Sequence, residues 1–295
     1  MLASNGEDPW VEIRQFQQPG DAEQHALVLI AMSIRCLIIR KPWGIGLMVA
    51  TPDAERAEYQ LQEYAAENRP PPPHIQRFSI SQVVDGALVF SAIIVLIQAA
   101  AEAHLFGLEW LSAGAADAVA IKSGEWWRAF TALGLHGDLG HLLSNVAFGA
   151  FFGIVLCQIL GAGLGWLAIL MSGGLGNIVS AMFHSGSHSA IGASTAVFGA
   201  LGLVAGLTWQ QQRFFRTGLR RYAPLAAGLM LLAFLGIGGE RTDIGGHIAG
   251  FGAGIALAIP LHLVRERLPD DIRSQFRYGA AAILIFALAW ILALN

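Results

Sequence analysis

Four polar side chains in the apolar part of this 295-residue sequence could do chemistry: His141, Asn145, Ser194 and His247. Polar groups are costly inside a membrane-spanning helix, so each is a candidate functional residue. His141 and Asn145 open one predicted span, and Ser194 and His247 open two others that run in the same direction. We therefore expect three helices to bring these groups to one depth near the outer membrane face.

Ser194 follows Gly192 and Ala193 at the start of a predicted helix, where backbone N–H groups are free. A serine there can present its hydroxyl beside groups that stabilise an anion. The alternative is a simple helix N-cap. His247 could take the serine proton, which activation of a serine nucleophile requires. The alternative for His247 is a core histidine bonded to a carbonyl.

Glycines predict how Ser194 and His247 could meet. With about 100° of rotation per residue, small residues share one face of the helix that Ser194 opens, and glycines lie within about 60° of His247 on its helix. These residues are Thr195, Gly199, Gly202 and Gly206 on the first helix, and Gly250 and Gly254 on the second. Small residues let helix backbones approach closely, so we predict contact between the imidazole and the hydroxyl.

His141 and Asn145 are four residues apart and so lie on one helix face. Both can donate hydrogen bonds, which suits stabilisation of a developing oxyanion. The alternative is a polar clamp between helices. His136 is predicted in the preceding loop as a supporting residue. Asp243 is predicted to be a cap or loop residue, so we predict a Ser–His dyad.

Composition excludes an ordinary soluble enzyme. The chain is 55% hydrophobic and only 13% charged, whereas soluble domains are about 25% charged. A net charge of −3 gives no reason to expect a nucleic-acid partner. Cys36 and Cys157 lie in a polar and an apolar segment, so no disulfide is expected. A lipid bilayer is the expected surrounding of most of the chain.

The pattern predicts an all-α polytopic membrane protein preceded by a small soluble α+β domain. Seven apolar stretches are predicted to span the membrane: 86–108, 139–160, 164–183, 193–209, 223–239, 245–264 and 279–295. Before them, a βαββα order is predicted, with strands at 11–16, 34–40 and 45–50 and helices at 21–32 and 51–67. The predicted domains are an accessory domain at 1–69, a proline-rich linker at 70–85, a six-helix domain at 86–264, and a connector with a seventh helix at 265–295.

Arginine placement predicts the orientation. Two clusters follow the fourth and sixth spans: Arg213, Arg216, Arg220 and Arg221, and Arg265, Arg267, Arg273 and Arg277. Basic loops stay in the cytoplasm. The N-terminal domain is therefore expected in the cytoplasm, and the candidate site is expected to open to the outside. We expect a bacterial inner (plasma) membrane.

The motifs together resemble the rhomboid intramembrane serine proteases over about residues 90–264. In order, they are Trp127-Arg128, His136, His141-Leu142-Leu143-Ser144-Asn145, Gly192-Ala193-Ser194 and Gly246-His247-Ile248-Ala249-Gly250. Their order, spacing and membrane placement are more specific than any one motif.

The resemblance implies a six-helix bundle with a water-filled cavity that opens outward. Ser194 would be the nucleophile and His247 the general base, with the Ser194 N–H, His141 and Asn145 as the oxyanion hole. It also implies supporting residues, an aromatic under the catalytic histidine included: His136, Phe198, Trp127, Arg128 and Gly192. The fifth span would be a lateral gate, the seventh a six-plus-one arrangement, and membrane proteins the substrates. No cofactor or metal is expected.

Thr195 departs from the resemblance, because that family usually has glycine after the serine. This keeps open the alternative of a non-catalytic rhomboid-like protein that binds membrane clients. Another rival is a metal transporter or metalloprotease, since His184 and His188 are four residues apart. Their surroundings suit a loop better than a ligand helix, and no His-Glu-x-x-His motif occurs.

Overall fold

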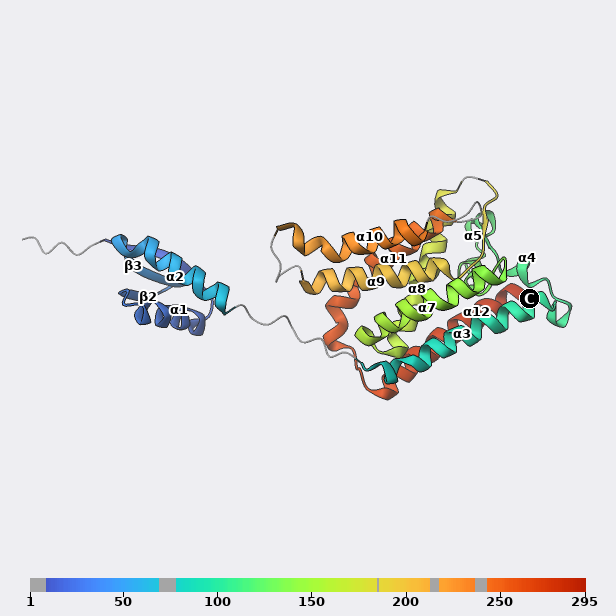
Figure 1. Cartoon of the computed structure of the whole chain (residues 1–295), viewed down its shortest axis with the longest axis horizontal. Helices are drawn as coiled ribbons and strands as arrows, with labels where there is room; N and C mark the ends of the chain where they lie inside the picture. Colours follow the sequence, from blue (N-terminus) through green and yellow to red (C-terminus); the bar gives the residue numbers. More distant parts are fainter. Residues whose placement is uncertain (1–8, 69–77, 185, 213–217, 237–242) are drawn as a thin grey trace, which may run out of the picture. The chain divides into compact units, whose positions relative to one another are not determined.

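The computed structural model describes residues 9–68, 78–184, 186–212, 218–236 and 243–295. The chain divides into two compact units, residues 1–71 and 72–295 (Figure 1). The predicted proline-rich segment at 70–73, and Arg213 and Arg216 of the first arginine cluster, lie outside the described residues.

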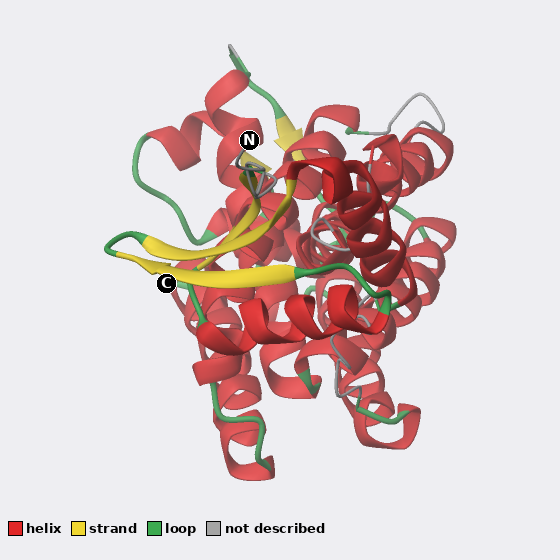
Figure 2. Ribbon diagram, turned by 90° about the vertical axis from the view of Figure 1, so that its left-hand side faces the viewer, coloured by secondary structure: helices red, strands yellow, loops and turns green. Residues whose placement is uncertain are grey.

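The first unit has the predicted βαββα order. Its elements are β1 (Trp10–Phe16), α1 (Pro19–Ala31), β2 (Cys36–Lys41), β3 (Gly44–Ala50), the short helix η1 (Thr51–Asp53) and α2 (Ala54–Glu67). The three strands form an antiparallel sheet in the order β1-β3-β2, drawn in yellow in Figure 2. Leu47 and Val49 of β3 are fully buried with Leu29 of α1 and Leu61 of α2, so alternate residues of the central strand form the core under the two helices.

The second unit is a helical bundle whose long helices run roughly side by side in Figure 1. Those long helices are α3 (Ile80–Glu102), α7 (Leu139–Leu160), α8 (Ala162–Phe183), α9 (Ser194–Gln212), α10 (Ala223–Gly236), α11 (Ile244–Val264) and α12 (Ile272–Leu294). Shorter elements join them: η2 (Leu105–Gly107), α4 (Trp110–Gly114), β4 (Ala116–Asp117), α5 (Ala118–Lys122), α6 (Arg128–Thr131), η3 (Ala132–Gly134), β5 (Ser189–Ala190), η4 (Gly218–Tyr222) and η5 (Arg265–Arg267).

A long helix forms at each of the seven predicted spans, but α3 and α12 begin six and seven residues earlier than predicted. Ser79 and Gln82 form a capping box that starts α3 at Ile80. Asp271 accepts hydrogen bonds from the N–H groups of Arg273 and Ser274, which starts α12 at Ile272. Both helices therefore begin with a polar turn, which a prediction based on apolar stretches does not include.

Six segments of the described chain are long and apolar enough to span a membrane: α3, α7, α8, α11, α12 and Gly218–Gly236, which combines η4 and α10. The predicted span at 193–209 forms α9, which is not among the six. Neighbouring helices enclose α9, and most of its residues, from Thr195 to Leu207, are buried. A helix surrounded by protein does not need a continuous apolar surface.

Helices α9 and α11 are in contact along the predicted glycine faces. A Cβ atom at Gly254 would overlap the carbonyl oxygen of Gly199, and one at Gly202 would overlap the carbonyl oxygen of Phe251. A Cβ atom at Gly206 would lie 2.6 Å from the Cβ of Ala258. Backbone thus packs directly on backbone, as small residues at a helix interface allow.

The seventh long helix, α12, is joined to the bundle by Gln275. Its Oε1 accepts hydrogen bonds from the N–H groups of Gly163 (2.9 Å) and Leu164 (3.1 Å), and its Nε2 donates to the carbonyl of Leu160 (3.2 Å). These are unpaired backbone groups at the turn between α7 and α8. At the other end of α12, the Trp290 ring lies 5.0 Å from the ring of Trp110.

Two alanine substitutions on α11 test the glycine contact. Gly254→Ala would force α9 and α11 apart, so we expect the free energy of unfolding to fall by about 1–3 kcal/mol. Gly252→Ala is the matched control, because a Cβ there meets nothing within 4 Å, and alanine is the better helix former. Circular dichroism during titration of detergent micelles with a denaturing detergent measures both. Equal stability of the two variants would contradict the contact.

Candidate active site

Ser194 and His247 meet where α9 and α11 begin. Ser194 Oγ lies 2.9 Å from His247 Nε2. Gly192 makes the turn before α9 possible, since its φ is +131° and its N–H donates to the carbonyl of Ala132 (2.9 Å). A Cβ at Gly192 would also lie 2.7 Å from the His141 ring, so glycine allows that ring to approach the backbone beside Ser194.

The second nitrogen of His247 determines which tautomer faces Ser194. His247 Nδ1 lies 3.0 Å from the carbonyl oxygen of Gly236, at the end of α10. A carbonyl only accepts hydrogen bonds, so Nδ1 carries the proton and Nε2 presents a lone pair to the Ser194 hydroxyl. The Phe198 ring lies 4.5 Å from the His247 ring and supports it from one turn along α9.

Asp243 is a helix cap, as predicted. Its Oδ1 accepts a hydrogen bond from the Gly246 N–H (2.8 Å) at the start of α11. The Nδ1 of His247 bonds to the backbone carbonyl of Gly236 and not to the Asp243 carboxylate. Ser194 and His247 therefore form a pair in which a backbone carbonyl orients the histidine.

His141 and Asn145 face the same cavity from α7. Asp138 caps this helix by accepting from the His141 N–H (2.8 Å), and Asn145 Nδ2 donates to the His141 carbonyl (3.0 Å). The cavity has a volume of about 1030 Å³, and its lining includes His141, Asn145, Ser194 and His247. All four residues singled out by type and spacing therefore open onto one space.

His136 supports the turn before Ser194. Its Nε2 accepts a hydrogen bond from the N–H of Ala193 (3.3 Å), and its own N–H donates to Gln98 Oε1 (2.8 Å) on α3. The His136 side chain is buried and its ring lies 5.1 Å from the ring of His141. Burial, and secondly the His141 ring, lowers the pKa of His136 to about 4. The neutral ring is the form that can accept from Ala193.

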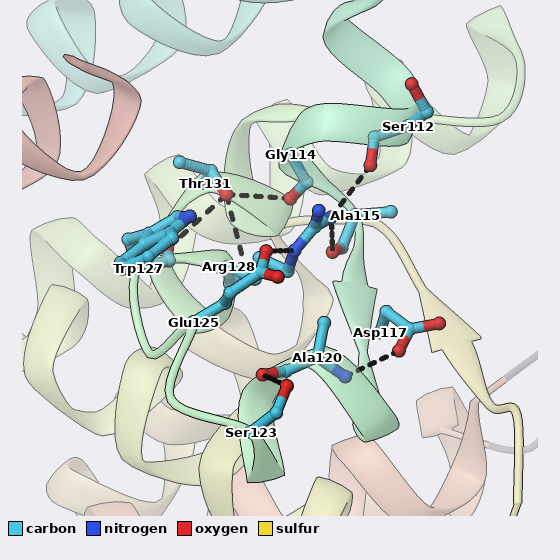
Figure 3. A network of polar contacts seen from close by, with 10 residues as sticks. All are labelled: Ser112, Gly114, Ala115, Asp117, Ala120, Ser123, Glu125, Trp127, Arg128 and Thr131. Atoms are coloured by element: carbon cyan, nitrogen blue, oxygen red, sulfur yellow. Dashed lines mark hydrogen bonds and ion pairs between the residues drawn. The ribbon is translucent and has the colours of Figure 1, made fainter. Parts of the chain in front are cut away.

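Trp127 and Arg128 belong to a separate network in the loop between α3 and α7 (Figure 3). Arg128 Nε pairs with Glu125 Oε2 (2.6 Å), and its Nη1 donates to the carbonyls of Ser112 (2.7 Å) and Ala115 (3.3 Å). The Trp127 carbonyl accepts from the hydroxyl of Thr131. These contacts hold the loop together and do not bring either side chain to the Ser194–His247 pair.

Thr195 packs away from the cavity, whose α9 residues are Ser194, Val197 and Phe198. The Thr195 methyl carbon lies 2.7 Å from where a Cβ of Gly176 would be and 3.0 Å from where one of Gly250 would be. Glycines on α8 and α11 thus leave room for the branched side chain, so Thr195 does not narrow the cavity beside Ser194.

Three partners of the site were not predicted from the sequence: the Gly236 carbonyl, Gln98 and Asp138. A backbone carbonyl is present at every residue, so the sequence does not mark this one. Gln98 lies 38 residues before His136, so no local pattern connects the two. Asp138 did carry a signal, because an aspartate three residues before the N–H it accepts from is an N-cap spacing.

The family model for the rhomboid domain matches residues 123–264. Among curated proteins, the chain is 31% identical to Rhomboid-like protease 3 of Toxoplasma gondii over 58% of this chain and 64% of that protein. It is 30% identical to Rhomboid protease GluP of Bacillus subtilis (50% and 29%) and 33% identical to RHOMBOID-like protein 6, mitochondrial, of Arabidopsis thaliana (55% and 52%). The chain thus spans less than two thirds of the length of each of these relatives.

The lowered pKa of His136 predicts an acid-sensitive fold. Its unfolded pKa is about 6.5 and its folded pKa about 4, so the folded protein binds fewer protons between these values. The contribution to stability is complete above pH 6.5 and is lost as the pH falls toward 4. His136→Gln keeps an acceptor for Ala193 without titrating. We expect its unfolding midpoint in detergent to fall less than that of the wild type between pH 7 and 4.5; parallel profiles would refute this assignment.

Proposed function

Because this chain belongs to the rhomboid family and is a multi-pass membrane protein, we propose that it is an intramembrane serine endopeptidase that cleaves transmembrane segments of other membrane proteins. The observation that carries the proposal is the 2.9 Å contact between Ser194 Oγ and His247 Nε2, with the other histidine nitrogen on a carbonyl. A hydroxyl facing an imidazole lone pair is the arrangement of an activated serine.

In the first half of the reaction, Ser194 Oγ attacks the scissile carbonyl carbon while His247 Nε2 takes the hydroxyl proton. The resulting imidazolium donates that proton to the leaving amine, and the acyl group stays on Ser194. In the second half, His247 takes a proton from water, the hydroxide attacks the acyl carbon, and the proton returns to Ser194. The Gly236 carbonyl holds the Nδ1 proton throughout.

The negative charge that develops on the scissile oxygen needs donors nearby. The Ser194 N–H is free for this role because it lies at the first residue of α9. His141 and Asn145 line the same cavity from α7. We assign these three groups to the oxyanion hole, with His136 holding the preceding Ala193 N–H in place.

The proposal includes the predicted domain boundaries and the predicted orientation in the membrane. Residues 86–264 would be the protease domain, 1–69 a cytoplasmic accessory domain, 70–85 a linker, and 265–295 a cytoplasmic connector with the seventh helix. The arginine clusters support an orientation with the cavity on the outer face. The relatives come from Toxoplasma, Bacillus and Arabidopsis, and the bacterial inner membrane stays a prediction.

One substitution tests the nucleophile. Ser194→Ala removes the attacking oxygen and leaves the helix contacts, so we expect no cleavage of a single-span substrate whose helix is weakened by glycines near the outer face. It should also abolish labelling by a serine-directed fluorophosphonate. Ser144→Ala is the control for labelling, since Ser144 lines the same cavity but its hydroxyl bonds to the His141 carbonyl.

The two readouts separate the proposal from its rival. Cleavage by Ser194→Ala equal to that of wild type would overturn the assignment of the nucleophile. Failure of folded wild type both to cleave and to be labelled would favour the non-catalytic protein that binds membrane clients.

Asn145 tests the oxyanion hole. Asn145→Ala and the isosteric Asn145→Asp both remove the amide donor, so we expect kcat to fall about 100- to 1,000-fold with a smaller change in KM. Steady-state cleavage of the same substrate in detergent measures both constants. A raised KM with unchanged kcat would instead place Asn145 in substrate binding.

A further inference from the structure

A second group of chemically active side chains lies at the rim of the cavity. His184 ends α8, His188 precedes β5, and Asp243 caps α11. One ligand atom from each lies within 4.8 Å of the other two. The two imidazole rings stack in parallel, 3.7 Å apart with an interplanar angle of 4°, and His188 Nε2 lies 3.5 Å from Asp243 Oδ2.

The hydrogen bonds of His184 and Asp243 leave one ligand atom free on each. His184 Nδ1 lies 2.8 Å from the Ser180 carbonyl, so it carries the proton and Nε2 has the free lone pair. Asp243 Oδ1 accepts from the Gly246 N–H, which leaves Oδ2. His188 Nε2 is buried and has no hydrogen-bond partner among the described residues. A buried nitrogen without a hydrogen-bond partner needs an explanation, and a bound ion would supply one.

Hydrogen bonds to their backbone carbonyls hold both histidines in place before any ion binds. The His184 carbonyl accepts from Lys122 Nζ, and the His188 carbonyl accepts from the Ala118 N–H (2.8 Å). Both donors belong to α5, so one short helix fixes both ends of the segment between the histidines. Gly245 leaves room beside them, because a Cβ there would lie 3.2 Å from His184 Cε1.

We propose that His184, His188 and Asp243 form a binding site for a divalent transition metal, with Zn²⁺ as the best fit. Two imidazoles and one carboxylate suit Zn²⁺, whereas Ca²⁺ and Mg²⁺ prefer oxygen ligands alone. Tetrahedral zinc needs its ligands about 3.3 Å apart, so the three ligand atoms must move closer together. One of the two stacked rings must also turn out of the stack, because an imidazole lone pair lies in the plane of its ring. Three protein ligands leave the fourth position to water.

The site is accessible to an ion. The His188 and Asp243 side chains are 30% and 21% exposed, and both line the same cavity as Ser194 and His247. Metal binding here does not depend on the proposed protease activity. It would tie the ends of three segments, α8, β5 and α11, at the cavity rim.

Zinc titration of the full chain in detergent tests the proposal. After chelator treatment, isothermal titration calorimetry with ZnCl₂ should give one bound Zn²⁺ per chain and a higher melting temperature, since a ligand that binds the folded state stabilises it. His184→Gln, His188→Gln and Asp243→Asn should each weaken binding at least tenfold. Asparagine retains an oxygen to cap α11, so Asp243→Asn keeps the helix start intact.

Two controls make the outcome decisive. His104→Gln removes an exposed histidine beside Glu109 and should leave zinc affinity unchanged. Ser194→Ala should also bind as wild type does. Three outcomes would each overturn the proposal. They are a zinc affinity that stays within twofold of wild type in all three rim variants, loss of zinc binding in Ser194→Ala, and no stoichiometric zinc binding to the folded wild type.

Discussion

The approach of α9 to α11 is the constraint on which the site depends. In lipid no hydrophobic force drives two helices together, so their association rests on close packing. Gly202 of α9 faces the backbone of α11, and Gly250 and Gly254 of α11 face the backbone of α9. The separation of Ser194 and His247 is therefore set by contact between two backbones. If long side chains filled this interface, the distance between Ser194 and His247 would vary with the rotamers of those side chains.

A second constraint is that polar groups in an apolar bundle need partners. The backbone supplies most of them here: the Gly236 carbonyl for His247 and the Ala193 N–H for His136. Both partners lie at helix ends, where backbone groups are unpaired in any case. The cost of placing histidines in the bundle is thus offset by groups that required partners themselves. A carbonyl orients His247 but carries no full charge, so in the proposed mechanism the imidazolium would gain less stabilisation than a carboxylate would give it.

The residues of the Ser194–His247 site could be found from sequence because each carries its own signal. A polar group in an apolar span and glycines on one helix face are local patterns, and they predicted both the cavity residues and the helix contact. The order of elements in the first unit was also predicted, since Gly44 and Pro52 mark the turns around β3. The starts of α3 and α12 were placed too late because Ser79 and Asp271 begin these helices with polar turns. The rim cluster was predicted only in part: the spacing of His184 and His188 raised a metal site as an alternative, but Asp243 is brought to them only by the packing of α11 on α8.

That packing connects the two groups of polar residues on the cavity. Asp243 uses one oxygen to cap the first turn of α11 and presents the other toward His188. His247 lies in the same first turn, and its N–H donates to the Asp243 carbonyl (3.1 Å). A change at the rim that moves Asp243 must therefore act on the turn that orients the imidazole. Ser194 Oγ and His247 Nε2 are at hydrogen-bond distance, so displacement of that turn by a fraction of an ångström would alter the contact on which the proposed activation of the serine depends.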